Sequence, residues 1–120
     1  MEKRDISEAE LEIMQALWRR KEAVTAQSVA EALEKKAWKY STIATLLGRL
    51  VEKGAVTYEK RGRFYYYTPL LGEREYRQAQ TKKLVARLYG GSVKNLVVSL
   101  FENNTLTEQE IAEIKRKFEL

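Results

Sequence analysis

Four polar side chains recur at helical spacing between Trp38 and Lys53, and their types suit contact with nucleic acid. They are Ser41, Thr42, Thr45 and Arg49. Residues three and four apart lie on the same side of a helix. Short hydroxyls near a helix start reach base edges and phosphates, and an arginine reaches a guanine or a phosphate. The spacing therefore predicts a helix face that contacts DNA, with Lys39 and Tyr40 beside it at the start of the helix.

A basic turn follows this predicted helix. It reads Lys60, Arg61, Gly62 and Arg63. The turn separates two runs, 56–58 and 64–66, whose side chains alternate with period two, which predicts a β-hairpin with Gly62 at positive φ. Three cations at its tip can straddle a phosphate backbone or enter a minor groove. The hairpin therefore adds Lys60, Arg61 and Arg63 to the predicted DNA-binding residues.

Each of these features also has a simpler explanation. Serine and threonine are common caps at helix starts, and basic hairpin tips are often solvated turns. Trp38 and Tyr40 can act by packing alone, which is the explanation we favour for Trp38. The aromatic run 64–67 suits stacking on single strands, although we favour half of its rings in the core and half covering adjacent helices. The helix, Lys53-Gly54 and the basic hairpin together favour DNA.

The composition excludes several other classes of protein. The 120 residues include 22 lysines and arginines against 17 aspartates and glutamates, with no cysteine and no histidine. Disulfides, thiolate catalysis, zinc fingers and histidine-based acid–base chemistry are therefore excluded. The carboxylates fall at helix caps and on polar helix faces, without a nucleophile motif or a glycine-rich loop. We therefore expect no enzyme, no catalytic residue, no cofactor and no metal site.

The basic excess, which gives a formal net charge of +5, is concentrated in residues 39–68. This stretch holds six basic residues against Glu52 and Glu59, and such a distribution is compatible with a nucleic-acid partner. No apolar run approaches the length of a membrane span, and the opening residues MEKRDISEAE do not form a signal peptide. We therefore expect the protein in the cytoplasm.

The elements that must position these residues are predicted to be three helices and a β-wing. A capping box beginning at Ser7 opens a first amphipathic helix, and Thr25 caps a second. The third begins near Tyr40, and Gly54 ends it in the left-handed conformation. A short extended segment near 23–24 is expected to pair with the hairpin. The predicted fold is mainly α with a small β-wing, a winged helix-turn-helix.

Residues 1–70 are predicted to form this DNA-binding domain, and residues 71–120 a helical dimerisation domain. A long polar helix, a short apolar helix and a helix opened by a capping box at Thr107 follow one another. Their apolar positions are Leu84, Leu88, Val93, Leu96, Val97, Leu100, Phe101, Ile111, Ile114 and Phe118. A stretch of about 50 residues cannot bury these side chains alone. We therefore expect a homodimer in which a second copy covers them.

An ordered set of short motifs resembles the penicillinase and methicillin-resistance repressors (BlaI/MecI), relatives of the copper-responsive CopY repressors. In the first half these are Ile6-Ser7-Glu8-Ala9-Glu10, Ile13-Met14, Leu17-Trp18, Trp38, Thr42-Ile43, Thr45-Leu46-Leu47, Arg49-Leu50, Lys53-Gly54-Ala55, Gly62-Arg63 and Tyr67-Thr68-Pro69. In the second half they are Tyr89-Gly90-Gly91, Asn95-Leu96-Val97, Phe101-Glu102-Asn103 and Leu106-Thr107-Glu108-Gln109-Glu110-Ile111. No single motif is decisive, but the ordered set covers essentially the whole chain and is highly specific.

The resemblance implies a homodimeric transcriptional repressor. Such a repressor binds a palindromic operator of double-stranded DNA with TACA/TGTA half-sites, and antibiotic-resistance genes are candidate targets. The positions matching Ser41, Thr42 and Thr45 would face the major groove, and the wing would contact the backbone. The resemblance also implies an inducing protease, because a β-lactam acting through a membrane-bound sensor leads to cleavage of such repressors in their dimerisation helix.

Three features of the sequence depart from the pattern of these repressors. Ser99-Leu100 stands where the β-lactamase repressors have a scissile Asn-Phe bond, so the sequence leaves open whether repression is relieved by proteolysis or by another route. The absence of cysteine excludes the cysteine cluster of the copper-responsive branch. Lys39-Tyr40-Ser41 replaces the more usual Ser-Pro-Lys at the start of the recognition helix, which points to a changed base preference.

The same elements also suit a second function. A winged helix can serve protein–protein association, with its basic face solvated or docked on an acidic partner. Titration of labelled genomic fragments separates the two functions, because only DNA recognition predicts tight binding that falls steeply with salt. The sequence favours DNA recognition because the polar helix face and the basic hairpin follow each other directly.

Overall fold

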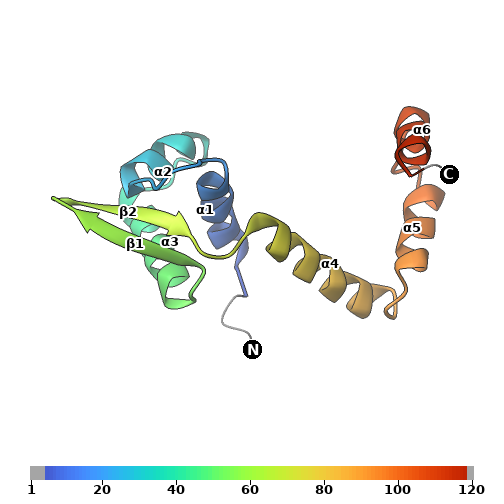
Figure 1. Cartoon of the computed structure of the whole chain (residues 1–120), viewed down its shortest axis with the longest axis horizontal. Coiled ribbons are helices and arrows are strands. Elements are labelled where there is room, and N and C mark those ends of the chain that lie inside the picture. The colour runs from blue at the N-terminus through green and yellow to red at the C-terminus, as the bar shows by residue number, and fades with distance from the viewer. Residues whose placement is uncertain (1–4, 119–120) are drawn as a thin grey trace. The chain divides into compact units, whose positions relative to one another are not determined.

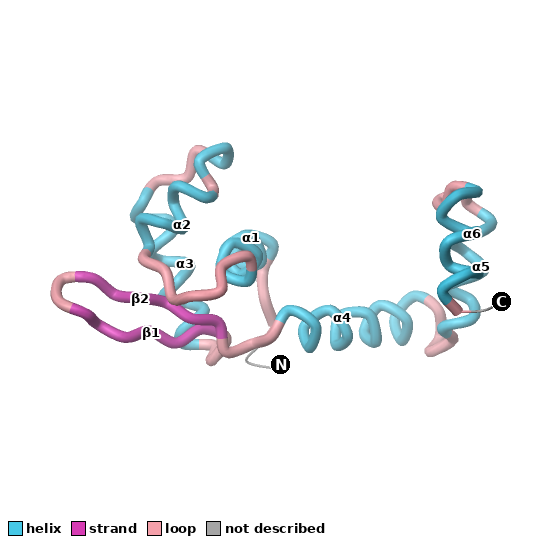
Figure 2. The backbone as a smooth tube through the Cα atoms, turned by 45° about the horizontal axis from the view of Figure 1, so that its top comes forward, coloured by secondary structure: helices cyan, strands magenta, loops and turns pink. Residues whose placement is uncertain are grey.

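The computed structural model describes residues 5–118, which divide into two compact units (Figure 1). The first unit ends at Tyr76 and the second begins at Arg77. Figure 2 distinguishes the helices of both units from the single hairpin in the described part of the chain. No helix among the described residues has the length and apolar character needed to cross a membrane.

The first unit is built from three α-helices, a short 3-10 helix and a two-stranded antiparallel sheet. In chain order these are α1 Glu8–Trp18, α2 Ala26–Ala32, η1 Glu34–Lys36, α3 Tyr40–Glu52, β1 Val56–Arg61 and β2 Phe64–Pro69. The predicted capping box is confirmed, since the Ser7 hydroxyl accepts from the Glu10 N–H and the Glu10 carboxylate accepts from the Ser7 N–H. Thr25 caps α2, also as predicted.

The core of the first unit lies between α1, α2, α3 and the base of the hairpin. Its largest fully buried apolar side chains are Ile13, Met14, Leu17, Val29, Ile43, Leu47, Leu50 and Val56. Each side chain of this size contributes roughly 1.5–3 kcal/mol by leaving water. The buried positions of α3 recur at intervals of three and four, so the opposite side of the helix faces solvent.

The hairpin pairs from Val56 opposite Pro69 to Arg61 opposite Phe64. Its loop is only Gly62-Arg63, shorter than the four-residue turn that the sequence predicts, because Lys60 and Arg61 continue the first strand. Gly62 has a φ of 64°, which a residue with a Cβ rarely adopts. The expected extended segment is confirmed as a single bridge, in which Val24 and Tyr67 exchange backbone hydrogen bonds of 3.1 and 2.7 Å.

The prediction that half of the aromatic run 64–67 lies in the core is wrong. Phe64 and Tyr65 are 54% and 44% exposed, and Tyr66 and Tyr67 are half-buried. Of the four rings, only Tyr67 packs against the core cluster. The reason is the length of the hairpin, whose tip projects beyond the three helices (Figure 1). Only its base can therefore pack on them.

An ion pair fixes the end of α3 to the start of α1. The Nζ of Lys53 lies 2.5 Å from Oε1 of Glu10 and donates to the backbone carbonyl of Asp5 at 2.8 Å. Among the described residues, Glu10 is the only polar or charged one that is buried. Because Gly54 follows with a φ of 77°, the chain turns sharply from this ion pair into the hairpin.

The second unit contains most of α4 Glu73–Leu88, together with α5 Val93–Glu102 and α6 Glu108–Lys117. The second capping box is confirmed at Thr107, and Ser92 caps α5. Within the described part of this unit, Val85 is the only buried side chain. The exposed large apolar residues are Leu84, Leu88, Val93, Val97, Val98, Phe101, Ile114 and Phe118. Leu96, Leu100 and Ile111 are half-buried.

Candidate nucleic-acid interface

The polar face of α3 is exposed as the sequence predicts. Lys39, Tyr40, Ser41, Thr42, Thr45 and Arg49 are all in the exposed class. A shallow hollow along the helix is lined by Leu46 and by four of these residues, Ser41, Thr42, Thr45 and Arg49. Since the apolar residues of α3 are held in the core, this face is fixed rigidly toward solvent.

Capping does not explain the hydroxyls of this face. The N-cap of α3 is Lys39, whose side chain makes no capping bond. Ser41 and Thr42 lie inside the first turn, and neither hydroxyl has a hydrogen-bond partner among the described residues. The Thr45 hydroxyl donates to the Ser41 carbonyl at 2.9 Å, which fixes its rotamer and leaves its lone pairs free to accept. Three hydroxyls therefore face solvent, and a hydrogen bond positions that of Thr45.

Arg49 supplies a cation on the same face. It is exposed and forms no ion pair with any residue that the structure describes. Lys39, at the start of the helix, is likewise exposed and unpaired within residues 5–118. A carboxylate partner would compete with an anionic ligand, so unpaired cations are suited to contact phosphates or guanine.

The basic residues of the wing are held by its aromatic rings. The Nζ of Lys60 lies 5.8 Å from the centre of the Tyr65 ring, and the guanidinium carbon of Arg61 lies 4.8 Å from that of Tyr66. Arg61 also pairs with Glu59, with 3.4 Å between its Nε and the Oε1 of Glu59. These contacts extend both cations along the strand, where their charged ends stay in solvent.

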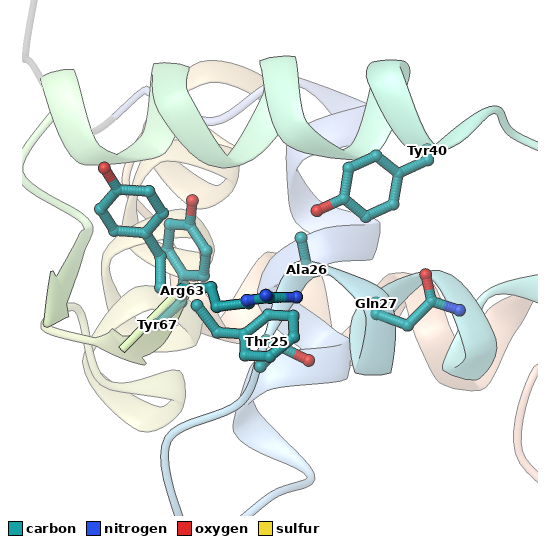
Figure 3. Close-up of a pocket in the computed structure, with 8 residues that line it drawn as sticks. Thr25, Ala26, Gln27, Tyr40, Arg63 and Tyr67 are labelled. Atoms are coloured by element: carbon teal, nitrogen blue, oxygen red, sulfur yellow. The ribbon is translucent and has the colours of Figure 1, made fainter. Parts of the chain in front are cut away.

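Arg63 differs from the other two wing cations because it points back toward the helices. It lines a pocket of about 260 Å³ together with residues from three other segments. The remaining lining residues are Thr25, Ala26, Gln27, Tyr40, Phe64, Tyr65 and Tyr67. Figure 3 shows the guanidinium of Arg63 extending toward Ala26, on the side of the pocket that the Tyr40 hydroxyl faces. The pocket therefore lies between the first residue of α3, the start of α2 and the wing.

Sequence reasoning missed the contribution of Thr25, Gln27 and Tyr67 to this pocket. Thr25 was identified only as a cap, and it does cap α2. The available signal was the predicted pairing of the 23–24 segment with the hairpin, because that pairing brings the next residues beside the wing. Burial, together with the neighbouring phenols of Tyr40, Tyr65 and Tyr58, raises the pKa of Tyr67, so its hydroxyl keeps its proton.

Comparison with known proteins identifies the family of the chain. A family model described as penicillinase repressor matches residues 6–119. The penicillinase repressor of Bacillus licheniformis is 35% identical over 109 residues, covering 91% of this chain and 85% of that protein. The methicillin resistance regulatory protein MecI of Staphylococcus aureus (strain N315) is 31% identical over 111 residues, covering 92% of this chain and 90% of that protein.

Solved structures that match this chain include two of the repressor BlaI. The solution structure of the DNA-binding domain of the repressor BlaI has 40% identity and a TM-score of 0.54, covering 60% of this chain and 88% of that one. The Bacillus licheniformis BlaI monomer in complex with the blaP half-operator gives 40% identity and a TM-score of 0.51, with the same coverage. These likenesses confirm the mainly α winged-helix fold, and the chain belongs to the penicillinase repressor family.

Proposed function

We propose that this protein is a transcriptional repressor that binds a palindromic DNA operator as a dimer. The observation that carries the proposal is the exposed face of α3, where three hydroxyls and the unpaired Arg49 stand beside a basic wing. Support comes from the related BlaI monomer, whose structure was solved in complex with a half-operator. The matching region covers 60% of this chain and 88% of that one.

Specificity and affinity would come from different residues of this interface. Lys39, Lys60 and Arg61 would contact phosphates, which gives affinity that depends on salt but not on sequence. Ser41, Thr42, Thr45 and Arg49 would read base edges in the major groove of TACA/TGTA-like half-sites. Two-fold symmetry places such half-sites about one helical turn apart, roughly 10 base pairs.

The second unit supports a dimer. Leu88, Val93 and Phe118 are each more than 60% exposed, and only Val85 of the described part of this unit is buried. So large an apolar surface in a small helical unit is stabilised by burial against another chain. A second copy of this unit would supply that burial and would bring two DNA-binding units to one operator.

Relief of repression would act on the same unit. An inducing protease that cut within α5 would divide the apolar helix that runs from Val93 to Glu102. Ser99, in the middle of this helix, accepts a hydrogen bond from the Tyr89 hydroxyl at 3.2 Å and another from the Asn103 amide at 3.3 Å. Cleavage here would remove the surface proposed to hold the two copies together. Antibiotic-resistance genes are the proposed targets.

Fluorescence anisotropy tests the DNA interface directly. Titration should use a duplex with two TACA/TGTA half-sites and a shuffled duplex of the same composition, at several salt concentrations. Arg49→Ala should cost about 1–3 kcal/mol on the operator and much less on the shuffled duplex, because it removes a base contact. Arg61→Ala should weaken both duplexes alike.

Two results would contradict the proposal. Affinity that does not change between low and physiological salt would exclude phosphate contacts as its source. Absence of binding to every duplex would instead favour the other role of a winged helix, association with an acidic protein partner. A third result, an equal loss of affinity on both duplexes for Arg49→Ala, would show that Arg49 does not read bases.

A further inference from the structure

The pocket between the recognition helix and the wing has a lining suited to an anion. Its lining residues include the cation Arg63 and the polar residues Thr25, Gln27 and Tyr40, and none of them carries a carboxylate. Among the described residues, the Arg63 guanidinium has no ion-pair partner and the Tyr40 hydroxyl has no hydrogen-bond partner. Unpaired donors with no carboxylate beside them favour a ligand that brings several acceptor oxygens.

The geometry brings the two donors together from separate elements. Tyr40 is the first residue of α3 and is 55% exposed, whereas Arg63 lies in the loop between β1 and β2. In Figure 3 the Tyr40 hydroxyl and the Arg63 guanidinium point into the same space. The pocket volume of about 260 Å³ accommodates a tetrahedral oxyanion with bound water. Its mouth lies on the same unit as the exposed face of α3.

We propose that this pocket binds one phosphate of the DNA backbone, with the Tyr40 hydroxyl and the Arg63 guanidinium as its donors. The inference rests on the proposed function, because the backbone phosphate comes from the operator. It goes further by assigning Arg63 to a site apart from Lys60 and Arg61, which extend along the strand on Tyr65 and Tyr66. The phosphate would connect the recognition helix to the wing.

A double-mutant cycle measures this connection. Tyr40→Phe removes one hydroxyl from an exposed ring and should weaken binding about threefold to tenfold. Arg63→Gln should weaken binding about tenfold or more and lower the salt slope by about one unit. Because both donors share one phosphate, the double variant should lose much less than the product of the single losses.

Arg61 provides the matched control for the cycle. It carries the same charge in the same hairpin but is held by Glu59 and Tyr66, outside the pocket lining. The losses of Tyr40→Phe and Arg61→Gln should therefore multiply. If the losses of Tyr40→Phe and Arg63→Gln also multiplied while the protein still bound the operator, the shared phosphate site would be refuted. The proposed function would remain intact. A wild-type protein that binds no duplex would overturn both.

A second measurement separates the DNA backbone from a free anion as the source of the phosphate. NMR spectra of the DNA-free protein should be recorded in sodium phosphate and in sodium chloride at equal ionic strength. The proposal predicts little shift of the Arg63 side-chain signal in millimolar phosphate and a large shift on adding the operator duplex. A large shift in inorganic phosphate, combined with multiplicative losses in the cycle, would make this a site for free anions and overturn the backbone assignment.

Discussion

The Glu10 carboxylate links the start of α1 to the end of α3. It is buried at the first turn of α1, accepts from the Ser7 N–H and faces the ammonium of Lys53 at the end of α3. Burial raises the pKa of Glu10, but the hydrogen bonds from Lys53 and Ser7 and the charge of Lys53 together lower it below its ordinary value. The charged form is therefore stabilised by the fold.

This ion pair should make stability depend on pH. Because the folded pKa of Glu10 is depressed, its contribution is present above the pKa of the unfolded chain and is lost as pH falls through the folded pKa. Glu10→Gln should lower the free energy of unfolding at pH 7 by about 3 kcal/mol, the low end for a buried pair, because Lys53 is partly exposed. Urea unfolding at pH 7 and near pH 3 measures this difference, which should shrink in acid.

Glu12 offers the control for this prediction. Its ion pair with Lys36 has a distance of 3.4 Å, and both side chains reach solvent. Glu12→Gln should therefore change the free energy of unfolding by about 0.5 kcal/mol or less at either pH. A loss for Glu10→Gln that stayed the same from neutral pH to acid would show that the pair contributes through shape alone and would refute the electrostatic account.

At the scale of the elements, local signals were sufficient to predict the helices and the hairpin. The capping boxes at Ser7 and Thr107 each depend on two residues three apart, and the structure places a helix after each. The apolar period of α3 fixes which face is buried, so the exposed positions of the recognition helix could be read from the sequence. The family resemblance is confirmed as well.

Contacts between distant segments were not predictable in the same way. The Glu10–Lys53 pair joins residues 43 apart, and no local pattern marks it. The pocket around Tyr40 and Arg63 depends on the bridge between Val24 and Tyr67, which places the wing beside α2. The burial of the aromatic run 64–67 was predicted wrongly. Alternation of side chains along a strand shows which residues share a face, but it does not show how far the strand extends beyond the core.

Gly48 and Gly54, two glycines of the helix-to-wing segment, should respond in opposite ways to alanine. Gly54 has a φ of 77°, so a Cβ there is strained even though no atom lies within 4 Å. Gly48 lies inside α3, exposed and equally free of neighbours. Gly54→Ala should cost about 1 kcal/mol of stability, and Gly48→Ala should add up to about 1 kcal/mol. Urea denaturation of both variants tests this; two changes of the same sign would contradict the backbone argument.

At the scale of the whole molecule, two units with different surfaces are joined in one chain. The first has a dense core and an exposed polar face, whereas the second exposes apolar side chains on α4, α5 and α6. In the proposed repressor, a single DNA-binding unit would recognise one half-site with limited affinity. Linking two such units in a dimer would make the second contact intramolecular, which would raise affinity by about 10²–10⁴ without any new contact to DNA.

The exposed stripe of α5 is where this coupling can be tested. Val93, Val97 and Phe101 are four residues apart and all exposed, while Leu96 is half-buried inside its own unit. Val97→Asp should therefore prevent dimerisation without unfolding the helices, because a charge buried in an apolar interface has no partner. Light scattering should then show a monomer, and affinity for a two-half-site duplex should fall by about 10²-fold or more while affinity for a single half-site is kept.

Lys94→Asp is the control for this last prediction, because it introduces the same carboxylate on α5 at an exposed polar position beside the stripe. It should leave the dimer and the operator affinity nearly unchanged, since a solvated charge there displaces no apolar contact. If both variants remained dimeric, the subunits would associate through another surface. If Val97→Asp were monomeric but bound the full operator as tightly as the wild type, dimerisation would not be the source of operator affinity, and a single unit would be sufficient for repression.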